Sequence, residues 1–126
     1  MTKGLFVKEP WIDLLLSGDK TWEIRGSDTK HRGPLFLIKS GTGQAFGLIN
    51  LYETQKIPKE DFLKYAEHHK VYNQEVSYKN IWAWKMEKPR IFESPVDIKL
   101  KPGAVIFLNL EGTQFKTMKD LYLLSL

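Results

Sequence analysis

The sequence has 126 residues, of which 42% are hydrophobic and 27% charged, and its formal net charge is +4. This size and composition predict one globular domain over residues 1–126. The chain contains no cysteine, which excludes disulfides, thiolate–zinc sites and a cysteine nucleophile. Its three histidines lack metalloprotease spacing, and no apolar run approaches the roughly 20 residues that cross a bilayer. We therefore expect a cytoplasmic protein without a metal, a cofactor or a membrane segment.

The first half of the chain predicts strands around one short helix. Apolar residues recur at helical spacing up to Gly18, a residue that favours the end of a helix. At Gly47 we expect a bulge or a close backbone approach. In chain order, we expect a strand at 5–7, a helix at 11–17, a strand at 21–25, a polar loop at 26–33, a central strand at 34–39, a turn at 40–43 and a strand at 45–52.

The second half predicts one more helix and further strands. The helix follows Pro58, and a buried stripe ending at His69 marks its inner face. After it we expect a polar loop at 70–79, a strand at 81–86, an extended stretch from 91 with an edge or a break at Pro95, and a strand at 104–110. The tail at 117–126 is compatible with a helix or a strand. About six mostly antiparallel strands with two or more short helices indicate an α+β fold, a small and partly closed β-barrel.

The most informative segment is 18–25, which reads GDKTWEIR. Side chains of a strand alternate between its faces, so the apolar pair can enter a core while Glu23 and Arg25 emerge side by side. Lys20 lies at the turn that leads into this strand. An ammonium, a carboxylate and a guanidinium together suit a polar, anionic or nucleobase-like ligand. Ion pairs that serve only the structure are the alternative.

Basic residues are concentrated between residues 20 and 39, whereas the acidic ones are spread along the chain. Such a patch predicts phosphate contacts, although a solvated lysine-rich loop would have the same composition. Arg32 is the preferred phosphate contact because its planar guanidinium can hold phosphate in a fork. Lys39 belongs to the same patch, and Ser40 begins a glycine-rich turn with free backbone N–H groups.

Aromatic residues allow either core packing or stacking on a base. Trp82 and Trp84 share one face of their strand, and we expect core packing for them and for Trp11. If Trp84 instead lined a cleft, stacking on a base would contribute roughly 1–3 kcal/mol. Lys8, just ahead of the first helix, is expected at the rim of such a cleft.

Several spaced motifs combine into a recognisable pattern. They are K-x-P-W at 8–11, L-x-x-G-x-K-T-x-E-x-R at 15–25, T at 29, R-G at 32–33, W-A-W at 82–84, P-V at 95–96 and P-G-A-V at 102–105. Together they resemble the ASCH (activating signal cointegrator homology) domain family over nearly the whole chain. The resemblance implies a PUA-like β-barrel and a cleft that binds RNA or nucleotides around the G-x-K-x-x-E-x-R residues.

The resemblance also implies possible enzymes, since some relatives hydrolyse acetylated cytidine and another is described as a ribonuclease. Lys20 matches the family lysine, but Glu23 stands where the amidohydrolases carry threonine. Glu67 is the nearest candidate for their glutamate. A protein-interaction module in transcription regulation is a third possibility. The fold alone does not determine the function. We prefer an RNA- or nucleotide-binding module, because the basic loop, the cluster of cations and a carboxylate, and the fold that the resemblance implies all favour it.

The candidate site follows from these arguments. Lys20 and Glu23 are the candidate catalytic residues. The candidate ligand-binding residues are Lys8, Lys20, Glu23, Arg25, Arg32, Lys39, Ser40 and Trp84.

Overall fold

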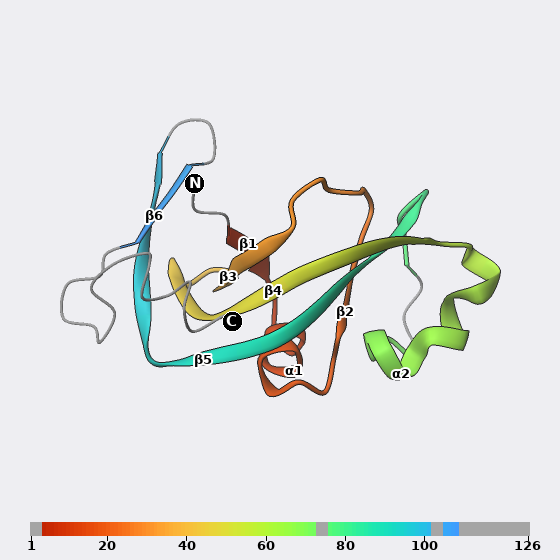
Figure 1. Cartoon of the computed structure of the whole chain (residues 1–126), viewed down its shortest axis with the longest axis horizontal. Helices are drawn as coiled ribbons and strands as arrows, with labels where there is room; N and C mark the ends of the chain where they lie inside the picture. The colour runs from red at the N-terminus through yellow and green to blue at the C-terminus, as the bar shows by residue number, and fades with distance from the viewer. Residues whose placement is uncertain (1–3, 73–75, 102–104, 109–126) are drawn as a thin grey trace.

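A strongly curved β-sheet with short helices against it forms the framework of the chain (Figure 1). The computed structural model describes residues 4–72, 76–101 and 105–108. Its elements are β1 (Gly4–Val7), α1 (Trp11–Ser17), β2 (Trp22–Arg25), β3 (Gly33–Lys39), β4 (Gln44–Ile57), the 3₁₀-helix η1 (Lys59–Tyr65), α2 (Ala66–His69), β5 (Ile81–Lys101) and β6 (Val105–Leu108).

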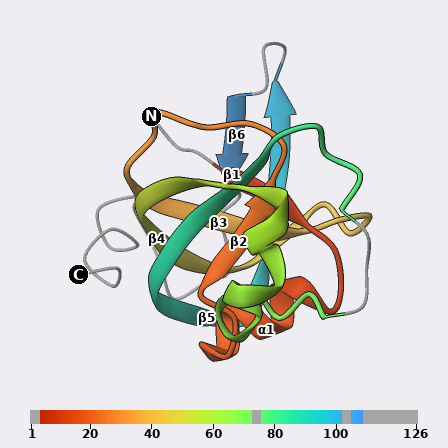
Figure 2. The same cartoon turned by 90° about the vertical axis from the view of Figure 1, so that its right-hand side faces the viewer.

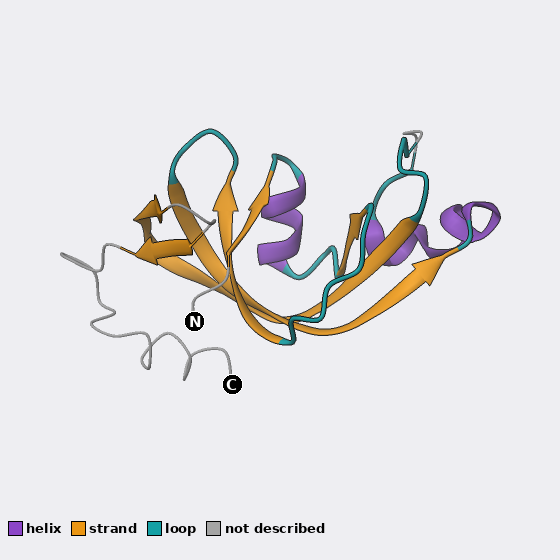
Figure 3. Cartoon of the chain, turned by 90° about the horizontal axis from the view of Figure 1, so that it is seen from above, coloured by secondary structure: helices purple, strands orange, loops and turns teal. Residues whose placement is uncertain are grey.

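The strands follow the order β1-β3-β4-β5-β2, and β6 pairs with the far part of β5. Among the described pairs, β1 with β3 is parallel and the others are antiparallel. The long strands β4 and β5 curve together, and α1 lies on their concave side (Figure 3). Viewed along the long axis, the strands curl around a common centre (Figure 2). The expected α+β, mostly antiparallel fold is confirmed.

The two ends of this strand order are joined by a side chain. Arg25, at the end of β2, donates a hydrogen bond from Nη2 to the backbone oxygen of Phe6 in β1, at 2.8 Å. The described ladders do not pair β1 with β2. The seam between these two strands is therefore bridged by a guanidinium.

Helix α1 sets the position of the segment that follows it. Its apolar side chains Ile12, Leu15 and Leu16 are buried in a core cluster that also contains residues of β1, β3, β4 and β5. The helix ends at Gly18, whose φ of 88° is left-handed, as the sequence predicted. The backbone N–H of Lys20 then bonds to the oxygen of Leu14 at 3.0 Å. Packing of α1 thus fixes where Lys20 enters the fold.

Strand β5 differs from the prediction, since it is one strand where two extended stretches were expected. Its register with β4 passes from Gly47–Ile91 to Ala45–Val96, so four residues of β5 lie opposite one residue of β4 at this shift. Pro95 falls in this bulge, where a missing N–H costs no ladder hydrogen bond, and the strand continues past it.

The remaining differences are smaller. Strand β4 continues to Ile57, beyond the expected end at residue 52. The expected second helix is η1 followed by the single turn of α2, and the inner stripe to His69 is buried except for half-buried Tyr65. From the expected strand at 104–110 the structure describes 105–108 as β6. The tail at 117–126 lies outside the described residues.

The close approach expected at Gly47 is confirmed. A Cβ atom there would lie 2.5 Å from the carbonyl oxygen of Arg90 and would collide with a methyl group of Leu16 in α1. A register shift in the β4–β5 ladder falls at the same place. The absence of a side chain at Gly47 therefore lets α1 and β5 pack closely onto β4.

We predict that Gly47→Ala lowers the free energy of unfolding by about 3 kcal/mol, because overpacking forces backbone or helix shifts. Gly41→Ala is the control, since Gly41 is exposed and open around its Cα, with a φ of +87°. It carries only left-handed strain, about 1 kcal/mol. Chemical denaturation measures both variants, and equal losses would contradict the packing argument.

Candidate functional site

A cavity of about 350 Å³ lies along the seam between β1 and β2. It combines charged, aromatic and small aliphatic side chains. Its lining residues are Phe6, Val7, Lys8, Trp11, Lys20, Glu23, Ile24, Arg25, Ser40, Val71, Val76, Ser77 and Tyr78. The cavity thus draws on β1, the start of α1, β2, the turn after β3 and the segment after α2.

Lys20 is the most deeply buried charged group in this wall, with 1% of its surface exposed. Its Nζ donates a hydrogen bond to the backbone oxygen of His69 at 2.6 Å and lies 3.6 Å from Oε1 of Glu23. It also lies 5.0 Å from the ring centre of Trp11. Burial lowers the pKa of Lys20 from 10.5 to about 8, and the attraction of Glu23 offsets part of that shift.

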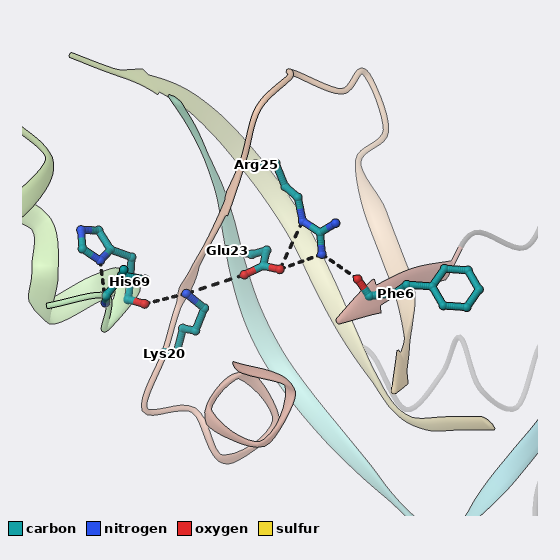
Figure 4. A network of polar contacts seen from close by, with 6 residues as sticks. Phe6, Lys20, Glu23, Arg25 and His69 are labelled. Carbon is teal, nitrogen blue, oxygen red and sulfur yellow. Dashed lines mark hydrogen bonds and ion pairs between the residues drawn. The ribbon is translucent and has the colours of Figure 1, made fainter. Parts of the chain in front are cut away.

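Glu23 connects the two cations of the site (Figure 4). Glu23 as a whole is 6% exposed, and its Oε2 accepts hydrogen bonds from Nη2 of Arg25 at 2.8 Å and from Nε at 3.2 Å. The same Nη2 reaches the backbone oxygen of Phe6. A row of alternating charges, Lys20, Glu23 and Arg25, therefore runs from α2 to β1 and carries a net charge of +1.

Two groups at this wall keep free hydrogen-bonding capacity. Nε and Nη2 of Arg25 donate hydrogen bonds to Glu23 and Phe6. Its third nitrogen, Nη1, has no hydrogen-bond partner in the described part of the chain. Lys8 is exposed and makes no ion pair with any described residue. Both cations can therefore contact an anionic ligand without losing an existing partner.

The structure brings five of the predicted site residues together and places three elsewhere. The residues that line the cavity are Lys8, Lys20, Glu23, Arg25 and Ser40. The residues outside its lining are Arg32, Lys39 and Trp84.

Each of the three outlying side chains has partners of its own. Arg32 is exposed and bonds to the backbone oxygens of Thr29 and His31 and to the hydroxyl of Thr54. Lys39 pairs with Glu9 and lies 5.2 Å from the ring centre of Phe46. Trp84 packs against the core and donates its indole N–H to the oxygen of Ser27 at 2.9 Å.

The sequence did not identify the wall formed after α2. Val71, Val76, Ser77 and Tyr78 come from a stretch expected only as a polar loop. The ring of Tyr78 packs against Gly26, where a Cβ would lie 2.7 Å from it. The glycine at position 26 was the sequence feature that could have indicated this contact, but a glycine does not show which residue packs against it. Trp11, expected in the core, is half-buried and lines the cavity as well as packing inward.

Other candidate features do not converge on this cavity. Glu67 is exposed and lies outside its lining. Over the described ranges, no group of three or more metal-ligating side chains gathers. In those ranges no helix combines the length and the apolar character needed to span a membrane. A second cavity of about 510 Å³ shares Lys20 but contains neither Glu23 nor Arg25.

Comparisons with known proteins agree with this architecture. The ASCH protein of Zymomonas mobilis has a solved structure that superposes with a TM-score of 0.68 at 11% identity, covering 98% of this chain and 93% of that one. Two mutant structures of the same protein give TM-scores of 0.66 and 0.67 at 10% identity; each covers 86% of this chain, and 87% and 89% of its own. At these identities the likeness shows the fold.

No curated protein matches the sequence. The model of the ASCH domain family matches residues 5–96, which include all the residues that line the cavity. This match covers well over half of the chain, and so the chain belongs to the ASCH domain family.

Proposed function

We propose that this chain binds RNA or a nucleotide in the cavity along the β1–β2 seam. The observation that carries the proposal is the row of charges in its wall, in which two cations face one carboxylate. The net charge of +1 favours an anionic ligand, and the low dielectric of a buried wall strengthens that attraction. The family to which the chain belongs supports the same class of ligand.

The size and lining of the cavity suit one nucleotide unit. Small-molecule sites commonly measure about 300–1,000 Å³, and this cavity lies at the lower end of that range. Trp11 and Tyr78 offer aromatic surface to a base, and stacking on such surface contributes roughly 1–3 kcal/mol. Lys8 and Nη1 of Arg25 are the available donors for a phosphate, and the hydroxyl of Ser40 adds a polar group.

We predict that Lys20→Gln weakens the binding of short single-stranded RNA and nucleoside monophosphates by roughly ten- to a hundredfold, since it removes a charge-assisted interaction from the wall. Glutamine keeps an N–H donor for the oxygen of His69. Fluorescence anisotropy and calorimetry at low salt measure the affinities. Binding by the wild type should weaken as salt rises, because phosphate contacts release counterions.

Arg32→Gln and Lys39→Gln are matched controls, because each removes one positive charge outside the cavity. We expect each to change the affinity by less than about twofold at moderate salt, where exposed charges are screened. If the controls weaken binding as much as Lys20→Gln does, the ligand lies on the basic loop and the cavity proposal is wrong.

We predict that the affinity for these anionic ligands falls as the pH rises above 8. Lys20 has a pKa of about 8, so below pH 8 its side chain is mostly an ammonium in the free protein. Above pH 8 the side chain loses its charge, and binding an anion then requires the uptake of a proton. The affinity should be nearly constant from pH 6.5 to 7.5 and then fall by up to about tenfold per unit. Equal affinities at pH 7 and pH 9 would exclude a charged Lys20 contact, and Lys20→Gln should abolish the dependence.

Hydrolysis of a modified nucleoside such as acylated cytidine, or of RNA, is the second candidate. The lowered pKa of Lys20 favours it, because an amine with a pKa near 8 can accept a proton near neutral pH. Against it, Glu23 stands where the amidohydrolases among the relatives carry a threonine, whose hydroxyl could serve as nucleophile. Both oxygens of Glu23 also face cations.

We predict no release of cytidine from N-acylated cytidine and no cleavage of single-stranded RNA above the rate without protein, because the position of the missing hydroxyl is held by a carboxylate that is already paired with two cations. Chromatography of reactions at pH 8 measures both products. Turnover that Lys20→Gln abolishes would establish the hydrolase instead.

A further inference from the structure

His69 is fully buried, and both nitrogens of its ring have partners. Its Nδ1 accepts a hydrogen bond from the backbone N–H of Val71 at 2.9 Å. Its Nε2 lies 2.7 Å from the backbone oxygen of Phe62, which can only accept. The proton of the neutral ring therefore belongs on Nε2. The ring also stacks on Phe62, with 4.1 Å between ring centres.

The same ring closes the turn that ends α2. Lys70 has a left-handed φ of 62°, and its N–H bonds back to the oxygen of Ala66 at 2.7 Å. The hydrogen bond from Val71 to the ring spans this turn, as the side chain of an Asx turn does. The backbone oxygen of His69 then projects to Nζ of Lys20 (Figure 4).

We propose that His69 is a positioning residue for the ligand cavity: its ring fixes the turn at 69–71, and this turn aims the oxygen of His69 at the ammonium of Lys20. Val71, held by the same ring, lines the cavity. One side chain therefore sets both the acceptor for Lys20 and the start of the wall formed after α2. The consequence for ligand binding rests on the proposed function; the consequence for Lys20 does not.

The charge state of the ring agrees with this role. Burial lowers the pKa of His69, and the nearby charges of Lys20 and His68 lower it further, while the bond to Phe62 opposes the shift. A second proton would have to sit on Nδ1, where the N–H of Val71 already points. The ring thus stays neutral and keeps its acceptor toward the turn.

Two conservative variants separate positioning from simple core filling. Asparagine can place an oxygen near the position of Nδ1 and keep the bond from Val71, but it loses the donor to Phe62. Glutamine can place a donor near Nε2 and keep the bond to Phe62, but it loses the acceptor for Val71. Each variant thus removes the ring and one hydrogen bond, and the bond that closes the turn is lost in His69→Gln alone.

The experiment compares His69→Asn with His69→Gln, using NMR titration of the Lys20 ammonium without ligand and anisotropy with short single-stranded RNA. We expect the pKa of Lys20 to stay within roughly 0.3 units of the wild type in His69→Asn and to move by more than about 0.5 units in His69→Gln. RNA affinity should change by less than about twofold in His69→Asn and fall roughly fivefold or more in His69→Gln.

If both folded variants leave the pKa of Lys20 unchanged, or shift it equally, His69 only fills the core and the proposal is overturned. If the wild type binds neither RNA nor a nucleotide, the proposed function fails, while the comparison of Lys20 pKa values still decides the role of His69. If neither variant folds, NMR of the wild type decides: a ring protonated on Nδ1, or no coupling between Lys20 Nζ and the His69 carbonyl carbon, overturns the proposal.

Discussion

The ion pairs of Glu23 with Lys20 and Arg25 are the interaction on which the arrangement of the site depends. Taking a charge out of water costs several kcal/mol, so each member of the row must be held by its neighbours. The row ends on two backbone oxygens, one in α2 and one in β1. It therefore joins β1 and β2, which the described ladders do not pair, to the end of α2, where the N–H of Thr21 also bonds to the oxygen of His68, and the cavity lies among them.

A row of buried charges can serve structure alone, and the cavity beside it is what distinguishes this one. One carboxylate cannot neutralise two cations, so the row keeps a positive charge that no other described residue pairs with. Lys8 and Nη1 of Arg25 add donors at the same place. The same electrostatic imbalance that makes the row costly for the isolated protein makes an anionic ligand favourable.

Local patterns predicted the centre of the site because its residues lie within six positions of one another. Strand alternation after a helix stop was enough to bring Glu23 and Arg25 together beside Lys20. The concentration of basic residues did not show that Arg32 and Lys39 turn to partners in β4 and before α1, outside the lining of this cavity. The wall after α2 depends on a contact of Tyr78 with Gly26, and such a long-range fit leaves no periodic signal. The α+β fold itself followed from strand and helix periodicity. That periodicity did not predict that β5 continues as one strand past the register shift at 92–95.

Arg25 spans the gap between β1 and β2 with its side chain, and this has a mechanical consequence. A rotation of that side chain would part the two strands locally, while β1 keeps its pairs with β3 and β2 keeps its pairs with β5. Such a rotation would also break both hydrogen bonds of Arg25 to Glu23, so it would cost three side-chain hydrogen bonds and an ion pair. This edge of the cavity is therefore held by side-chain contacts, and their loss would leave the pairs of the described sheet in place.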